Sequence, residues 1–152
     1  KVDDGARFRS LLSGVNRSAK EYGVDVIYPI HPRAKAQIDE FEISVPEKIL
    51  LSDTQEYLDF LRLESEADLI LTDSGGVQEE ACIVGVPCVT LRDSTERPET
   101  LDVGANVLAG VDPDQIRSSV NAMYGKVSDW KNPFGGGNSA TTILQTVLND
   151  TS

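Results

Sequence analysis

The sequence has few of the residues that build metal sites and disulfide frameworks. It contains one histidine, His31, and two cysteines, Cys82 and Cys88. Two cysteines do not make a disulfide framework, and with a single histidine they do not make a metal-ligand cluster. They are typical of small buried apolar groups in a reducing compartment, so the sequence favours a cytoplasmic protein without a metal centre.

Positive charge and long apolar runs are also scarce. The 14 lysines and arginines stand against 25 acidic residues, which gives a formal net charge of −11. This charge opposes binding to nucleic acid and to anionic membranes. No apolar run approaches the length of a membrane span, and the sequence starts without a signal-peptide pattern. An anionic ligand would therefore have to be held by local donors against an unfavourable overall field.

What the sequence does have is an alternation of strand and helix patterns. Its 152 residues and 39% hydrophobic content are enough for one domain with a single core. The alternation predicts an α/β fold, in which a parallel sheet is covered by helices on both faces. The expected helices are 4–22, a short one containing Ala34, Ile38 and Phe41, 54–65, 77–84, a short one from Pro98, 113–124 and 140–148. In the helix 54–65, Tyr57, Leu58 and Leu61 are expected to face inward. The expected strands are 24–30, 48–51, 68–72, 86–91 and 106–109.

The turn Asp73-Ser74-Gly75-Gly76, between the expected strand 68–72 and the expected helix 77–84, is the clearest site signal. The first turn of such a helix has unpaired backbone N–H groups and the positive end of the helix dipole, which together attract anions. Two glycines let a phosphate approach the backbone without interference from Cβ atoms. The turn predicts a pocket for a nucleotide diphosphate, although the local pattern fits a plain strand–helix turn equally well.

Three polar segments follow the ends of expected strands. They contain His31, Ser74 and the loop 92–97. Ligands of parallel sheets bind outside the carboxyl ends of the strands, so these segments are expected to meet at one edge of the sheet. That convergence favours the pocket over the plain turn.

The segment Thr72–Thr100, TDSGGVQEEACIVGVPCVTLRDSTERPET, closely resembles the signature of the non-hydrolysing UDP-N-acetylglucosamine 2-epimerases. The resemblance extends upstream through Phe60 and His31-Pro32 and downstream through Asn132–Gly137. It implies a Rossmann-like domain, one half of a B-type glycosyltransferase (GT-B) architecture. Residues 1–152 would be the C-terminal, UDP-binding domain, and the N-terminal domain would be absent from this chain. The complete enzyme would be a cytoplasmic homodimeric isomerase without a cofactor, which interconverts UDP-GlcNAc and UDP-ManNAc by eliminating and re-adding UDP.

The resemblance also implies which residues hold the diphosphate. Ser74, Gly75 and Gly76 would cradle it with backbone N–H groups and one hydroxyl. His31 stands at a position that contacts the phosphates in the family, although a histidine at a strand end is often structural. Arg97 resembles an arginine near the substrate, where a guanidinium suits a diphosphate or sugar hydroxyls.

Two further residues are implied for the nucleoside. Glu80 lies one helical turn after Gly76 and would accept both ribose hydroxyls, whereas Glu79 is expected to be a solvated charge. Phe60 stands where the family recognises uracil, largely through the backbone, and its side chain fits a core role equally well. Arg92 could assist at the diphosphate, but an ordinary surface ion pair with Asp93 or Glu96 is the favoured interpretation.

Two parts of the family's proteins have no counterpart in this sequence: the N-terminal domain and the strand before the helix 4–22. The acids thought to transfer protons at sugar C2 belong to the N-terminal domain, so no catalytic residue is expected here and the chain alone is expected to be inactive. The strand that precedes the helix 4–22 in the family would be central in a Rossmann-like order. Without it, the sheet is expected to be incomplete or completed by self-association. A GT-B glycosyltransferase domain, a hydrolysing epimerase and a stand-alone nucleotide-sugar-binding module remain as alternatives.

Overall fold

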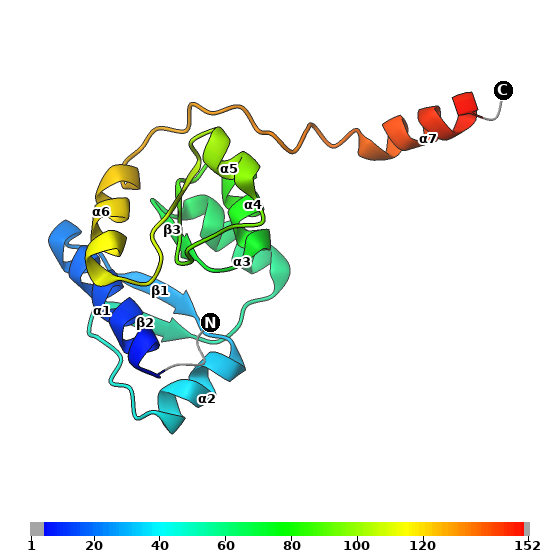
Figure 1. Cartoon of the computed structure of the whole chain (residues 1–152). Helices are drawn as coiled ribbons and strands as arrows, with labels where there is room; N and C mark the ends of the chain where they lie inside the picture. Colours follow the sequence, from blue (N-terminus) through cyan, green and yellow to red (C-terminus); the bar gives the residue numbers. More distant parts are fainter. Residues whose placement is uncertain (1–4, 151–152) are drawn as a thin grey trace.

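Strands and helices alternate along most of the chain, whose computed structural model describes residues 5–150 (Figure 1). The elements are α1 (Gly5–Tyr22), β1 (Val26–Pro29), α2 (Pro32–Glu40), β2 (Ile49–Ser52), α3 (Tyr57–Glu66), β3 (Ile70–Thr72), α4 (Gly75–Val84), β4 (Cys88–Thr90), α5 (Pro98–Asp102), β5 (Asn106–Leu108), α6 (Pro113–Met123) and α7 (Ser139–Asp150). Every strand pairing among these residues is parallel, which confirms the α/β class.

The strands form two separate sheets instead of the single sheet that the alternation predicts. β1 pairs with β2, and β4 lies between β3 and β5. Within residues 5–150 no strand pairing joins β1 or β2 to β3. Residues 5–150 thus contain one parallel sheet of two strands and one of three strands.

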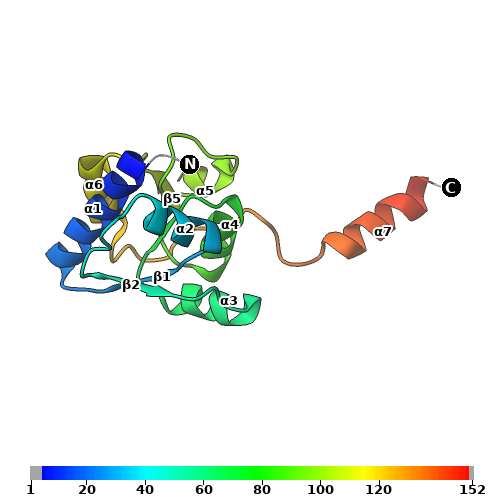
Figure 2. The same ribbon diagram turned by 90° about the horizontal axis from the view of Figure 1, so that it is seen from below.

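Helices α1 and α6 pack side by side and bury much of the core (Figures 1 and 2). Phe8 and Leu12 of α1 belong to the same apolar cluster as Ile116 and Val120 of α6. The two helices approach closely at Gly14, where a Cβ atom would lie 2.9 Å from the Cα of Pro113. A side chain at position 14 would therefore push the two helices apart.

Local signals set the ends of the best-defined helices. The side chain of Asp112 accepts hydrogen bonds from the N–H groups of Asp114 and Gln115, both at 3.0 Å, and so caps α6. Gly85 ends α4 with φ +83°, in the left-handed region that favours glycine. Both positions agree with the predicted helix ranges, 113–124 for α6 and 77–84 for α4.

One expectation about α3 is wrong. Tyr57 and Leu58 are 63% and 75% exposed instead of facing inward, and the buried residue of that helix is Glu64. The predicted helix 140–148 is present as α7, which projects from the body at the end of an extended segment (Figures 1 and 2). No helix in residues 5–150 is both long enough and apolar enough to cross a membrane.

Candidate functional site

The first turn of α4 begins directly after β3 and is open to solvent at its tip. Ser74 caps the helix: its Oγ accepts from the N–H of Val77 at 3.5 Å, and its own N–H donates to Oγ1 of Thr72 at 3.0 Å. For the described residues the structure records no hydrogen bond from the N–H groups of Gly75 or Gly76. Both groups are therefore available to an acceptor outside the helix, as the sequence predicts.

The protein itself does not require glycine at either position. Neither residue has a positive φ. A methyl group built on Gly76 would have only Oγ of Ser74 within 4 Å, at 3.8 Å, which is ordinary van der Waals contact. Glycine inside a helix is less stable than alanine by about 1 kcal/mol. The missing side chains leave space on the outside of the helix and make its backbone accessible.

Arg97 supplies a cation at this turn. A methyl group built on Gly75 would lie 3.8 Å from Cζ and 3.9 Å from Nη2 of Arg97. The guanidinium also forms an ion pair with Glu79, so Glu79 is not the isolated solvated charge that the sequence suggests. The structure thus brings together Ser74, Gly75 and Arg97 from two separate segments.

A buried network of polar side chains holds the loop that carries Arg97. Gln78, on α4, accepts hydrogen bonds through Oε1 from Oγ1 of Thr95 and from Nδ2 of Asn106. Thr95 accepts from the N–H of Arg97 at 3.0 Å, and Thr100 donates its hydroxyl to the carbonyl of Arg97 at 2.7 Å. The sequence analysis assigned no role to this network. The network could be recognised only by polar residues at buried positions, and the pattern of apolar and polar residues in the sequence does not show which polar residues are buried.

Two of the three segments that were expected to meet, the turn at Ser74 and the loop 92–97, lie next to each other. Burial, together with the negative charge of Asp73, raises the pKa of Tyr28 on β1. Arg92 reaches the turn at Ser74, because its Nη1 donates to the carbonyl of Asp73 at 3.4 Å, and it also pairs weakly with Glu96 at 3.9 Å.

His31 and Phe60 are placed less directly. His31 is the N-cap of α2, where its Nδ1 accepts from the N–H of Arg33 at 3.2 Å. In the neutral ring the hydrogen is then on Nε2, which is exposed and can donate. The N–H of Phe60 donates to the carbonyl of Glu56 within α3, so it is not free to bind a base. In the described part of the chain no hydrogen bond or ion pair joins either residue to Ser74 or Arg97.

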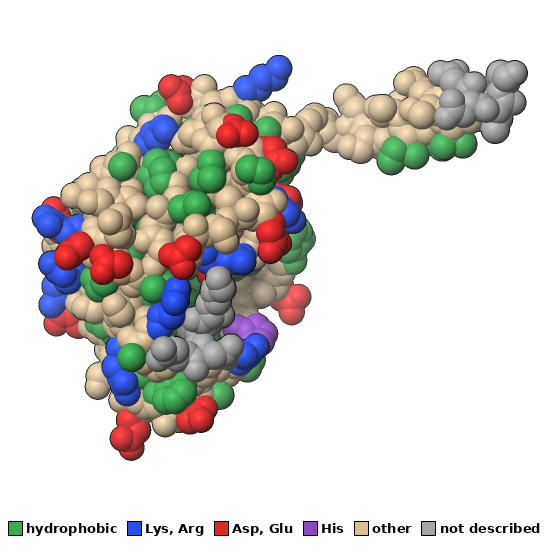
Figure 3. Space-filling view, in the orientation of Figure 1, with side chains coloured by type: hydrophobic (Ala, Val, Ile, Leu, Met, Phe, Trp, Pro, Cys, Tyr) green, Lys and Arg blue, Asp and Glu red, His purple; other side chains and the backbone are tan. Residues whose placement is uncertain are grey.

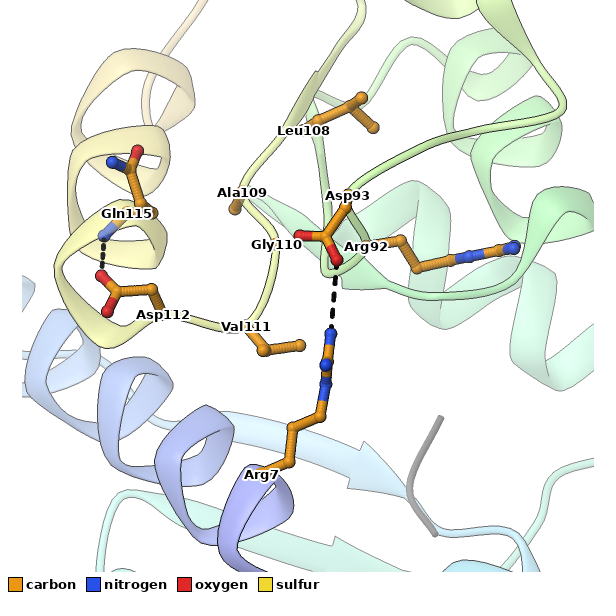
Figure 4. Close-up of a pocket in the computed structure, with 9 residues that line it drawn as sticks. All are labelled: Arg7, Arg92, Asp93, Leu108, Ala109, Gly110, Val111, Asp112 and Gln115. Carbon is orange, nitrogen blue, oxygen red and sulfur yellow. Dashed lines mark hydrogen bonds and ion pairs between the residues drawn. The ribbon is translucent and has the colours of Figure 1, made fainter. Parts of the chain in front are cut away.

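A hollow of about 440 Å³ opens beside the turn that precedes α4, at the carboxyl ends of β4 and β5 (Figure 4). Its lining includes Arg7, Arg92, Asp93, Val111 and Asp112. Figure 4 shows Arg7 and Asp93 facing each other across it, with Nη2 and Oδ2 3.4 Å apart. Of the candidate residues only Arg92 lines it, so the hollow adjoins the predicted site without containing it. No group of three or more potential metal ligands occurs in residues 5–150.

Comparison with known proteins identifies the family of the chain. The family profile described as UDP-N-acetylglucosamine 2-epimerase matches residues 1–148. The chain belongs to this family. The UDP-N-acetylglucosamine 2-epimerase of Methanocaldococcus jannaschii is 46% identical over 148 residues, which are 95% of this chain and 40% of that protein. The enzyme of the same name from Methanococcus maripaludis is 47% identical over 144 residues, which are 92% of this chain and 39% of that protein.

A solved member of the family also shares the fold. The crystal structure of the M. jannaschii UDP-GlcNAc 2-epimerase in complex with UDP-GlcNAc and UDP matches with a TM-score of 0.88 at 45% identity. The match covers 97% of this chain and 42% of that one. The chain thus corresponds to a part of a UDP-GlcNAc 2-epimerase and spans about 40% of the length of its curated relatives.

Proposed function

We propose that this chain is the C-terminal, UDP-binding domain of a UDP-N-acetylglucosamine 2-epimerase. The observation that carries the proposal is the pair Gly75-Gly76 at the start of α4. The fold does not require glycine there, and the N–H groups are unpaired among the described residues. A diphosphate uses both properties, because it approaches the backbone closely and accepts N–H hydrogen bonds.

The other groups at the turn suit the rest of a UDP-sugar. The hydroxyl of Ser74 and the guanidinium of Arg97 lie beside the two glycines and can donate to phosphate oxygens. His31 can donate through Nε2 from the end of β1. Glu80 follows on α4, one turn after Gly76, where a carboxylate can accept two ribose hydroxyls. Phe60, on the neighbouring helix α3, is the candidate residue for the part of the site that would bind uracil.

The role of such a domain is to grip UDP while the bond between the sugar and the diphosphate breaks. Negative charge develops on the departing diphosphate, so donors that are already oriented toward it stabilise the transition state more than the ground state. Retained UDP then re-adds to the sugar after C2 is inverted. The groups that move the C2 proton are assigned to the rest of the complete enzyme, and no metal or redox cofactor takes part.

Exposed apolar surface supports the proposal that the chain is a piece of a larger protein. Ile27 and Leu50 are register partners on β1 and β2, yet they are 57% and 50% exposed. Strands of parallel sheets are normally covered on both faces. One side of the projecting helix α7 is also apolar and uncovered (Figure 3). We assign the missing cover, and a strand between β1 and β3, to the remainder of the epimerase.

The substitution Gly76→Ala tests the proposed diphosphate site. The new methyl group meets no protein atom closer than 3.8 Å, so we expect the fold to be retained and the melting temperature to be at least that of wild type. The methyl group would occupy the approach of the phosphate, and the loss of one charge-assisted hydrogen bond of about 1.5–3 kcal/mol weakens UDP binding roughly tenfold or more. Isothermal titration calorimetry with UDP measures this change.

The matched control is Gly136→Ala. It makes the same chemical change at a loop glycine where an added Cβ would have no neighbour within 4 Å and where φ is likewise not positive. We expect wild-type UDP affinity for the control. Equal affinities for wild type, Gly76→Ala and Gly136→Ala would remove the assignment of the first turn of α4 as the diphosphate site.

A further inference from the structure

Glu64 is a buried carboxylic acid for which the fold offers no cation. It lies on α3 and is 4% exposed. Both carboxyl oxygens are shielded from solvent, and neither has a hydrogen-bond donor among the described residues. The nearest cation along the helix, Arg62, is bound to Glu66 at 2.9 Å on the exposed side. A charged carboxylate in such a place is costly, because it loses water without gaining a donor.

The neighbours of Glu64 indicate which group can share its proton. α3 packs against α4, and the titratable groups whose charge is coupled to that of Glu64 are Glu80 of α4 and the thiol of Cys88 on β4. Burial raises the pKa of Cys88 to about 12, so the thiol is uncharged. Burial first, then the charge of Glu80 and a hydrogen bond with it, raise the pKa of Glu64 to about 7. A protonated Glu64 therefore has the Glu80 carboxylate as its acceptor.

We propose that Glu64 is a positioning residue, which holds the carboxylate of Glu80 by a shared proton so that Glu80 can accept the ribose hydroxyls of UDP. This inference rests on the proposed function, because it needs Glu80 to face the ribose. The O–H of Glu64 donates to one oxygen of Glu80 and leaves the other lone pairs to the ligand. When the proton is lost, two carboxylates face each other and repel, and Glu80 turns toward water.

In this arrangement ligand binding depends on one proton. The pKa of Glu64 determines whether the affinity rises or falls with pH. That pKa lies above the ordinary value of 4.5, so the protonated, binding-competent form is fully present at acidic pH and is lost as the pH rises through about 7. If only this form binds, the affinity falls by up to about tenfold for each pH unit above 7.

The test compares the wild-type chain with Glu64→Gln and Glu64→Leu in calorimetric titrations of UDP-GlcNAc between pH 6 and pH 8.5. A sugar diphosphate ester is used because UDP itself has a terminal phosphate that titrates in this range. Glutamine keeps an N–H donor toward Glu80 and does not ionise, so we expect wild-type affinity at pH 6 and no loss at pH 8.5. Leucine fills the space without a donor, so we expect a melting temperature at least equal to wild type but weaker binding at every pH.

All ionisable groups other than Glu64 are common to the three chains, so the difference between the chains isolates Glu64. If wild type binds UDP-GlcNAc and the affinity of Glu64→Gln depends on pH in the same way, the inference is overturned. The proposed function is left intact by that result. Absence of binding by wild type at every pH would overturn both. A carbon-13 NMR titration of the carboxyl groups gives a readout without ligand. We expect the Glu64 midpoint near 7 to fall in Glu80→Gln, and an unchanged midpoint would contradict the shared proton.

Discussion

At the scale of single residues, the position of Arg97 is fixed before any ligand arrives. Its N–H and its carbonyl are bound by the hydroxyls of Thr95 and Thr100, and its guanidinium is paired with Glu79. Thr95 is in turn bound to the fully buried Gln78. A cation that is already ordered loses less conformational entropy on binding than a free surface arginine. We therefore expect the buried network to strengthen UDP binding without touching the ligand.

Thr95→Val tests this contribution. Valine keeps the shape of threonine but removes the hydroxyl that joins Gln78 to the N–H of Arg97. A lost hydrogen bond of about 1 kcal/mol predicts roughly fivefold weaker UDP binding and a melting temperature lower by a few degrees. Calorimetry and thermal unfolding measure both effects. Ser94→Ala, which removes an exposed hydroxyl from the same loop, is expected to change neither, and an unchanged affinity in Thr95→Val would separate the network from the site.

At the scale of elements, helices with strong end signals were predictable from the sequence, and the exposure of their faces was not. The cap of α6 at Asp112 and the end of α4 at Gly85 depend on local chemistry that the sequence displays directly. Which side of α3 is buried depends on what covers it, so Tyr57 and Leu58 were assigned inward wrongly. The burial of Glu64 ran against the ordinary preference of charged residues for solvent.

The same distinction applies to the site. Ser74 and the two glycines lie in one segment, and their arrangement at a helix start was predictable. The contact between Gly75 and Arg97 joins segments that are distant in sequence. The order of strands predicted that these segments meet, and the resemblance to the family singled out Arg97 within its loop. The ion pair of Arg97 with Glu79 was not predicted, because the periodicity of α4 places Glu79 away from the expected ribose face.

Helix α7 is expected to contribute nothing to the stability of the body. Its side chains at 139–148 are all exposed. In contrast, Trp130, which precedes it, donates its indole N–H to the carbonyl of Cys82 at 3.0 Å. A chain ending at Asn138 should therefore keep the wild-type melting temperature and UDP affinity, whereas a chain ending at Val127 should melt at a lower temperature. Thermal unfolding compares the two, and a large loss of stability on removing α7 alone would contradict the exposed position of the helix.

At the scale of the whole molecule, the chain is expected to bind UDP but not to complete the reaction. It covers about 40% of the length of the curated relatives, and its proposed site has donors for a leaving group but no assigned base for the C2 proton. With UDP-GlcNAc we expect no UDP-ManNAc from the chain alone. A protein extended by the remaining segment of an epimerase should form UDP-ManNAc.

Chromatography of the nucleotide sugars measures this turnover, with UDP binding by calorimetry as the control that the chain is folded. Conversion by the chain alone at a rate near that of a full-length relative would contradict the division of labour. Release of free ManNAc by the extended protein would instead indicate a hydrolysing epimerase, and transfer of the sugar to an acceptor would indicate a glycosyltransferase.

The central claim is that the bare N–H groups at the start of α4 bind a diphosphate in a chain with a net charge of −11. A crystal structure of the chain with UDP tests it most directly. The account predicts diphosphate oxygens within hydrogen-bond distance of the N–H groups of Gly75 and Gly76, with the guanidinium of Arg97 on the other side. UDP bound instead in the neighbouring hollow beside Arg7 and Val111, with no phosphate at the first turn of α4, would contradict it.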